Sequence, residues 1–383
     1  MGKVKTEETE TKSTVLGPAD ILKSHIKENK DEHLNLTKDT SDYIISSGSL
    51  ILDLEIGGGL KPAVYSATGI SGGGKSSSTL SFISEFLKQP KRMAMYFEIE
   101  RPLSMQHKER TDIKFIESGN FADWRDQTCY LYKGRIFEDV VKMINDLINN
   151  NVQDYKFFFV LDSMNALIPK EDEAKSIYEA IKVGGGALLT SHFLRLTSLK
   201  CSVLGHYCFL INQVRSKIKI NKYEKTIDNV SKTSSRPSSM DHYSEIVFEF
   251  QETNKSDYIY KDAAKTERIG KYAKVILEKN NLENKGELIK YPLRFGVTGK
   301  NIVWKEREIL DMLISWEHIK KDSAWMYPSE ELIECLKSKN FLIAEKFQEK
   351  SFLSYLDETS GVVDFLFEKC KNLVQCGRLN SCI

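Results

Sequence analysis

The chain has 383 residues, of which 41% are hydrophobic and 28% charged, and its net charge is +1. This length suits one large core with one or two smaller units, and the balanced charge gives no overall attraction to nucleic acid, so a DNA-binding surface has to come from local clusters. The seven cysteines form no Cys-x-x-Cys pair, no apolar run reaches the length of a membrane span, and no apolar signal segment follows Met1. These observations predict a soluble, intracellular protein with reduced thiols and no zinc site.

Residues 1–43 form a polar N-terminal segment with one short helical candidate at 18–30. We expect its outer part to be disordered, because it has too few apolar residues to pack. A core begins at residue 44 and is expected to end at 303. Strand candidates at 63–68, 93–99, 157–161 and 207–212 alternate there with helical spacing at 75–88, 135–150 and 186–200. This alternation predicts the α/β class, with a mostly parallel central sheet flanked by helices.

The end of the core is less regular. A polar stretch at 216–241 precedes three further strand candidates at 244–250, 272–278 and 287–295. Residues 304–383 are expected to form a small, mostly helical C-terminal domain, with Trp304, Trp316 and Trp325 as packing anchors.

Residues 69–76 fit the phosphate-binding pattern G-x-x-x-x-G-K-[ST] and lie between a strand candidate and a helix candidate. In such a loop the glycines turn backbone N–H groups toward a phosphate, and the helix N-terminus adds positive charge. Lys75 is expected to reach the β- and γ-phosphates, and the Ser76 hydroxyl to ligate Mg²⁺. A plain glycine-rich turn is the alternative, but the flanking elements favour a nucleoside triphosphate site. The predicted nucleotide-binding residues are Gly69, Ile70, Ser71, Gly72, Gly73, Gly74, Lys75, Ser76 and Ser77.

An acid that can hold Mg²⁺ from the other side follows the apolar run 157–161. Asp162 ends this run, and open α/β sheets place ligands at the carboxyl ends of their strands. A role as a helix N-cap is the alternative, and the phosphate loop upstream favours the metal.

Hydrolysis also needs a base near the attacking water. Glu98 and Glu100 end the strand candidate at 93–99 and are expected to project to the same side. Glu100 is the better candidate, because it lies at the end of the strand beside the phosphates. The alternative is a solvent-exposed carboxylate without a catalytic role.

The next strand ends at Gln213 and runs into the polar stretch. We expect the Gln213 amide to hydrogen-bond a γ-phosphate and to report its presence to the loop beyond, a turn amide being the alternative. The loop carries clustered cations, among them Lys217, Lys219 and Lys222, and this composition suits a mobile segment that binds a phosphate backbone. A merely solvated basic loop has the same composition.

Together these segments resemble the RecA family of recombinases. Residues 45–53 (ISSGSLILD) are similar to the family's opening motif, residues 161–170 (LDSMNALIPK) to its second acidic motif, and residues 211–218 (INQVRSKI) to the start of its second DNA loop. Residues 323–325 (SAW) fall where the C-terminal domain has G-A-W, so the resemblance spans about residues 45–330. The resemblance identifies a divergent RecA-like or UvsX-like member, and the high Lys, Asn and Ile content predicts a phage origin.

The resemblance implies a RecA-like ATPase core with an oligomerising N-terminal segment, ATP and Mg²⁺ as cofactors, and a cytoplasmic DNA-dependent ATPase, in the host cytoplasm if phage-encoded. It implies a homo-oligomeric filament on single-stranded DNA that pairs with homologous duplex, helped by single-strand-binding and loader proteins, with no membrane partner. Lys75 and Gln213 would act with Glu100 in catalysis, and Lys279 would reach the γ-phosphate of a neighbouring subunit. The first DNA loop would lie near 170–186. The implied DNA-binding residues are Ser191, Arg195, Arg215, Lys217, Lys219 and Lys222.

The sequence also departs from the family pattern. A second lysine that crosses the subunit interface is Asn281 here, and a DNA-contacting arginine is Leu188. The adenine-side Asp and Tyr correspond to Ser104 and His107, and a Gly-Gly pair near the end of the second DNA loop corresponds to residues 236–237. That loop is a few residues longer than in the family, and the acidic tail is absent.

Three functions remain open at this level. The first is a recombinase, and the second is a non-recombinogenic RecA paralogue that binds DNA in a regulatory role, marked by Asn281 and Leu188. The third is a hexameric helicase of the same core fold. The short N-terminal segment and the C-terminal resemblance to recombinases argue against the helicase.

Overall fold

The computed structural model describes residues 18–28, 43–173, 185–213, 238–262, 264–279, 286–296 and 302–375. The chain divides into two compact units, Met1–Asp39 and Thr40–Ile383. Helix α1 (Pro18–Glu28) belongs to the first unit and lies within the stretch where the sequence predicts a helix. All other described elements belong to the second unit. None of the helices in these ranges is long and apolar enough to cross a membrane.

The second unit is built on a ten-stranded sheet with the strand order β10-β9-β7-β1-β6-β5-β2-β4-β3, to which β8 is added by pairing with β9. The strands are β1 (Val64–Gly69), β2 (Arg92–Glu98), β3 (Lys114–Ile116), β4 (Thr128–Tyr132), β5 (Lys156–Asp162), β6 (Tyr207–Ile211), β7 (Val247–Phe250), β8 (Tyr258–Tyr260), β9 (Arg268–Lys279) and β10 (Leu288–Arg294). The seven strands from β7 to β3 in this order are parallel, whereas β8, β9 and β10 are antiparallel additions. The predicted mostly parallel α/β sheet is therefore confirmed.

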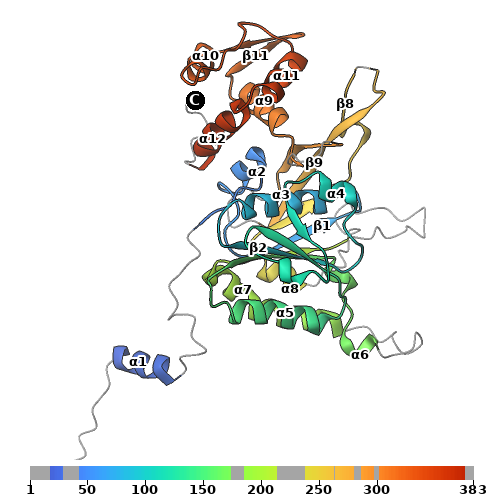
Figure 1. Cartoon of the computed structure of the whole chain (residues 1–383), viewed down its shortest axis with the longest axis vertical. Coiled ribbons are helices and arrows are strands. Elements are labelled where there is room, and N and C mark those ends of the chain that lie inside the picture. The colour runs from blue at the N-terminus through green and yellow to red at the C-terminus, as the bar shows by residue number, and fades with distance from the viewer. Residues whose placement is uncertain are drawn as a thin grey trace, which may run out of the picture. The chain divides into compact units, whose positions relative to one another are not determined.

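Helices cover both faces of the sheet (Figure 1). Helix α3 (Lys75–Leu87) packs on one face, where Phe82 and Phe86 join a core with Phe158 and Phe209 of the sheet. Helices α5 (Phe137–Asn149) and α7 (Gly185–Leu204) pack on the other face in a second apolar cluster. Strands buried on both faces have to be apolar along their whole length, which explains the run at 157–161.

Three short helices complete the large sheet domain: α4 (Met105–Glu109), α6 (Lys170–Glu173) and α8 (Ser238–Tyr243). Strands β3 and β4 at the edge of the sheet were not predicted from the sequence. β3 has an exposed and a half-buried residue among its three, so its hydrophobic pattern is weak. β4 is buried at four of its five positions, and its run TCYLY is typical of a strand.

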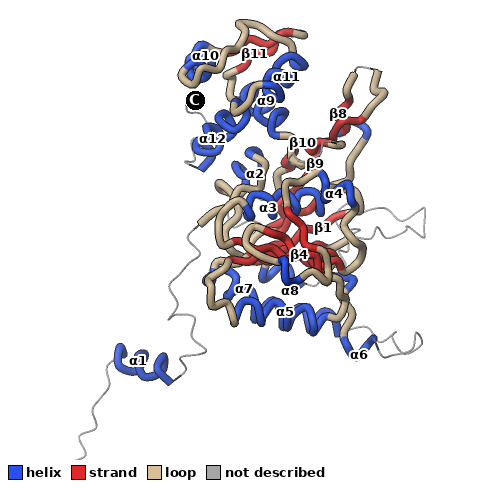
Figure 2. Tube along the Cα trace, viewed as in Figure 1, coloured by secondary structure: helices blue, strands red, loops and turns tan. Residues whose placement is uncertain are grey.

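The C-terminal region consists of helices and a hairpin (Figure 2), and their apolar side chains form a separate cluster. These elements are α9 (Lys305–Ser315), β11 (Ile319–Asp322), β12 (Trp325–Pro328), α10 (Glu330–Lys337), α11 (Glu349–Glu358) and α12 (Val362–Gln375). Trp304 is buried and Trp316 is half-buried, as packing anchors would be. The prediction for Trp325 is wrong, because its side chain lies on the short hairpin, is 40% exposed and is covered by the Lys346 ammonium at 5.0 Å.

Helix α2 (Leu50–Glu55) joins the two parts of the second unit, since Leu50 packs in the C-terminal cluster. The buried Glu308 carboxylate of α9 accepts hydrogen bonds from the backbone N–H groups of Leu50 at 2.9 Å and Ile51 at 3.2 Å, and from the Ser49 hydroxyl. A carboxylate at a helix N-terminus satisfies donors that have no partner within the helix. The ISSGSLILD segment therefore acts as a structural link.

Candidate nucleotide and DNA site

The phosphate loop leaves the carboxyl end of β1, in the middle of the sheet, and leads into α3. Gly69, Gly72 and Gly74 have φ angles of 137°, 80° and 111°, which side chains rarely adopt. A Cβ at Gly69 would lie 2.2 Å from the Phe250 carbonyl oxygen, whereas a Cβ at Gly72 would meet nothing within 4 Å. The loop thus packs closely against β7 on one side and faces open space at Gly72, as a phosphate cradle must.

Lys75 is buried at the start of α3, with 6% of its surface exposed. Its ammonium donates hydrogen bonds of 2.7 Å to the carbonyl oxygens of Gly69 and Ile70. Burial lowers the pKa of Lys75 to about 8, although the negative charges of Asp162 and Glu100 act in the opposite direction. Burial disfavours the charged form of this lysine, and an anionic ligand bound beside it would stabilise that charged form.

Ser76 and Asp162 are hydrogen-bonded to each other, from Oγ to Oδ2 at 3.0 Å. The Tyr96 hydroxyl donates to the same carboxylate oxygen, and burial together with the Asp162 charge keeps the pKa of Tyr96 well above its usual value, so this hydroxyl stays a donor. In the described part of the chain no three His, Cys, Asp or Glu side chains gather as a metal cluster. Mg²⁺ commonly takes one or two protein ligands and completes its shell with water and phosphate oxygens, and Ser76 with Asp162 fits that pattern.

Glu100 lies just beyond β2, and its exposed carboxylate is held by two donors. Its Oε2 accepts a hydrogen bond from the Ser163 hydroxyl at 3.0 Å and from the Gln213 amide at 2.9 Å. Its backbone N–H donates to the backbone carbonyl of Asp162 at 3.2 Å, which keeps Glu100 beside the end of β5. The backbone carbonyl of Gln213 in turn accepts a hydrogen bond from the Asn165 side-chain amide at 3.3 Å. The carboxyl ends of β2, β5 and β6 therefore meet through these side chains.

Glu98 does not share the environment of Glu100. It is the last residue of β2, is 6% exposed, and accepts a hydrogen bond from the backbone N–H of Leu103 at 2.8 Å. Its other carboxylate oxygen is buried and has no hydrogen-bond partner among the residues described. The chain leaves the strand after Glu98, so the expected alternation does not carry on to Glu100.

Lys279 ends β9 and is bound within its own subunit. Its ammonium donates to the carbonyl oxygens of His242 at 2.9 Å and Ser244 at 2.6 Å. To reach a neighbouring subunit, this side chain would have to leave both acceptors.

The candidate DNA-contacting residues fall into two groups. On α7, Ser191 is half-buried and Arg195 is exposed, and Leu188 is 74% exposed on the same helix. Arg215, Lys217, Lys219 and Lys222 lie outside the described residues, as does Asn281.

Two features near the loop were not predicted. Ser104 caps α4, and its hydroxyl is hydrogen-bonded to His107 Nδ1 at 2.7 Å. These two residues, which correspond to the family's adenine-side residues, are therefore bonded to each other. Lys271 of β9 donates a hydrogen bond to the Gly72 carbonyl of the phosphate loop. Besides Gly270, the buried positions of β9 are 271, 273, 275 and 277, which alternate along the strand. A lysine in this alternating buried set was the signal available in the sequence.

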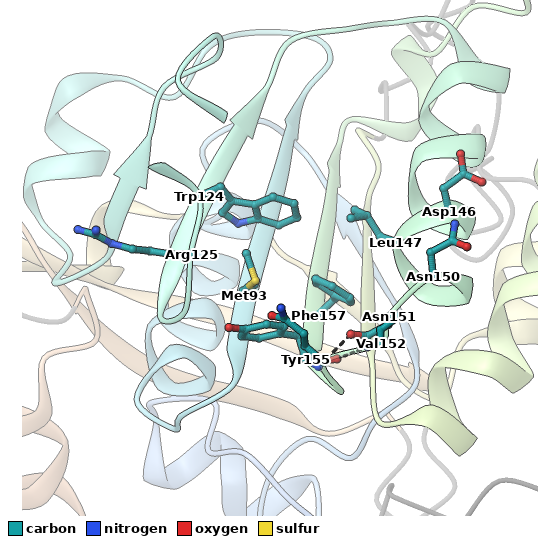
Figure 3. Close-up of a pocket in the computed structure, with 11 residues that line it drawn as sticks. Met93, Trp124, Arg125, Asp146, Leu147, Asn150, Asn151, Val152, Tyr155 and Phe157 are labelled. Carbon is teal, nitrogen blue, oxygen red and sulfur yellow. Dashed lines mark hydrogen bonds between the residues drawn. The ribbon is translucent and has the colours of Figure 1, made fainter. Parts of the chain in front are cut away.

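A cavity of about 460 Å³ lies elsewhere (Figure 3). Met93 and Phe157, at the amino ends of β2 and β5, line it together with Trp124 and Tyr155. The strands β1, β6, β5 and β2 are parallel, so this cavity at their amino ends lies on the opposite side from the phosphate loop, which follows the carboxyl end of β1. The cavity takes no part in the site above.

A phosphate loop between β1 and α3, with an acidic residue ending the second strand along the sheet, defines a RecA-like P-loop nucleotide-binding core. The family model for the RecA N-terminal domain matches residues 27–286. The chain therefore belongs to the RecA family.

Curated relatives agree with this assignment. Protein RecA of Malacoplasma penetrans is 26% identical over 331 residues, covering 84% of this chain and 88% of that protein. Protein RecA of Thermosynechococcus vestitus is 26% identical over 296 residues, covering 76% of this chain and 73% of the relative. Protein RecA of Enterococcus faecalis is 23% identical over 291 residues, with shares of 76% and 74%. At the level of the family, this is a protein of recombination and DNA repair.

Proposed function

We propose that the protein is an ATP-dependent, single-stranded DNA-binding recombinase that forms helical filaments and promotes homologous pairing and strand exchange. One observation carries the proposal: Ser76 is bonded to Asp162, and Glu100 is bonded to Gln213, beside one phosphate loop. Ser76 and Asp162 are suited to binding Mg²⁺. Glu100 is suited to act as the general base, and its bond to Gln213 links it to the loop that follows β6. Membership of the RecA family supports the same reading.

The loop N–H groups and Lys75 would hold the phosphates of ATP, and Ser76 with Asp162 would hold Mg²⁺. Mg²⁺, when bound, neutralises charge on the phosphate oxygens. Glu100 would accept a proton from the attacking water through its Oε1, because both of its donors among the described residues bond Oε2. Gln213 is one of those donors and directly precedes the second DNA loop, so its amide is well placed to link DNA binding to hydrolysis.

DNA would be held through its phosphate backbone by Arg195 of α7 and by the cations that follow Gln213. Such contacts bind single strands with little sequence preference, as a recombinase requires. Homologous duplex would be the second substrate, and single-strand-binding and loader proteins the expected partners, all in the cytoplasm. Phage origin remains a prediction from composition.

A non-recombinogenic paralogue is favoured by one observation. Leu188 is 74% exposed on α7, where the family resemblance implies a DNA-contacting arginine. An exposed leucine supplies no charge for a phosphate, so this helix would make one DNA contact fewer than the family pattern implies.

A strand-exchange reaction between circular single-stranded DNA and homologous linear duplex separates the two functions. We expect joint molecules and exchanged product with ATP and Mg²⁺, and none with duplex of unrelated sequence. Filaments with ATP hydrolysis but without joint molecules would assign the regulatory role. Absence of DNA-dependent hydrolysis would reject the recombinase, and absence of DNA binding would reject both.

A further inference from the structure

Lys271 is a lysine on the buried face of the sheet, with 9% of its surface exposed. Its ammonium donates to the Gly72 carbonyl, and it lies 3.3 Å from the Thr253 hydroxyl oxygen. The function proposed above gives this residue no role.

The strand that carries Lys271 runs along the phosphate loop. Ala273, two residues further on the same face of β9, lies 3.6 Å from the position that a Cβ of Gly74 would take. Lys271 occupies the corresponding place at Gly72, and that glycine faces open space. The Lys271 ammonium is therefore at the part of the loop where a ligand has room.

Lys271 adds a third cation to a small region. Its charge contributes to lowering the pKa of Lys75. The pKa of Lys271 is itself lowered, first by burial and then by the charge of Arg110. Arg110 bonds the Arg294 carbonyl oxygen and lies 5.6 Å from the Phe295 ring. Mutually repelling cations at a phosphate loop cost free energy in the protein alone, and a polyphosphate offsets that cost.

We propose that Lys271 is a second phosphate-binding lysine of the same subunit, which adds its charge beside Lys75 to a nucleotide polyphosphate on the loop. The proposal rests on the proposed nucleotide-binding function. It differs from a purely structural role, in which Lys271 would only brace Gly72. If Lys271 only holds Gly72 in place, it stabilises the nucleotide-free protein. If Lys271 binds phosphate, its charge destabilises the nucleotide-free protein and increases the stabilisation that bound nucleotide brings.

The test compares Lys271→Met, Lys271→Arg and a control, Lys290→Met, in the full chain. Lys290 lies on the neighbouring strand β10 with an exposed side chain, so the control removes the same charge away from the loop. Calorimetric titration with MgADP gives the affinity, and thermal unfolding with and without MgADP gives the stability.

We expect Lys271→Met to bind MgADP at least about tenfold more weakly, the loss of one charge-assisted hydrogen bond. Lys271→Arg should retain most of the affinity, Lys290→Met should match the wild type, and Tm without nucleotide should be unchanged or higher in Lys271→Met. Unchanged MgADP affinity in Lys271→Met would overturn the proposal while leaving the proposed function intact. A lower Tm without nucleotide, together with weak binding that arginine does not restore, would overturn it in favour of a brace. A wild type that binds no MgADP would overturn the proposed function as well.

Discussion

The Gln213 amide donates a hydrogen bond of 2.9 Å to the Glu100 carboxylate. This bond joins the second residue after β6 to the second residue after β2, although the two are 113 positions apart in the chain. It gives the proposed base and the proposed sensor a direct physical link. A change in the loop after Gln213 would therefore move or break the hydrogen bond that its side chain donates to Glu100.

The first prediction concerns Glu100. Glu100→Gln should still bind ATP but hydrolyse it about 10²–10⁴-fold more slowly, the range typical of removing a general base. DNA-bound filaments should then persist in ATP. Rates of phosphate release on saturating single-stranded DNA provide the measurement.

Glu98→Gln is the matched control, because Glu98 is two residues away, is buried and bonds only the Leu103 N–H among the described groups. If Glu98→Gln loses hydrolysis and Glu100→Gln does not, the assignment of the base is reversed.

The second prediction concerns Lys279. Lys279→Ala should lower ATP hydrolysis on saturating DNA, because a proposed contact with the neighbouring subunit is lost, and should not weaken ATP binding to the monomer. The variant also leaves the carbonyls of His242 and Ser244 without this donor, so we expect a loss of about 1–3 kcal/mol in stability. Asn281→Lys should strengthen ATP-dependent filament formation by adding a positive charge. Wild-type rates in a folded Lys279→Ala protein would show that β9 ends in a structural lysine only.

The third prediction concerns salt. Replacing Lys217, Lys219 and Lys222 together should flatten the slope of log affinity against log salt by up to about 2, at roughly 0.7 for each single-strand phosphate contact. Fluorescence anisotropy of a labelled oligonucleotide across a salt series measures the slope. An unchanged slope would exclude this segment from the DNA path.

The fourth prediction concerns two buried carboxyls. Burial raises the pKa of Asp53 and that of Glu308 to about 7 each, whereas both groups titrate near 4 in the unfolded chain. The folded protein thus holds protons that the unfolded chain has released, so the free energy of unfolding should fall as pH rises through about 7. The fall should be at most about 1.4 kcal/mol per pH unit for each carboxyl.

Urea unfolding between pH 6.5 and 8 measures this effect. Near pH 6.5, His206, whose pKa burial lowers to about 3, is neutral in the folded protein and about half protonated in the unfolded chain. Its titration opposes the fall, but it does so equally in every protein that keeps His206 and therefore cancels when slopes are compared. Glu308→Gln should have a shallower slope than the wild type, because one of the two titrating groups is gone. Equal slopes in the two proteins would mean that Glu308 is ionised throughout.

The sequence was sufficient for those parts of the fold and site that depend on local pattern. The phosphate loop, Asp162 and the buried strands each follow from a short run of residues, and the parallel sheet follows from their alternation. The roles of Glu100, Gln213 and Lys279 remain predictions, although the structure places the first two in contact.

The remaining features depend on contacts between distant residues. Lys271 and Gly72 are 199 positions apart, and Ser49 and Glu308 are 259 apart, so no local pattern could pair them. Trp325 failed as an anchor for a related reason. A large aromatic residue indicates a core only if the fold brings other elements over it, and this one lies on an exposed two-stranded hairpin.

Electron microscopy of the purified protein with single-stranded DNA, with and without ATP, tests the proposed function most directly. With ATP and Mg²⁺ we expect extended helical filaments, and without ATP, or with Lys75→Ala, few or none, because Lys75 supplies the charge that holds the phosphates. Closed six-membered rings, or filaments that form equally well without ATP and in Lys75→Ala, would contradict an ATP-dependent recombinase.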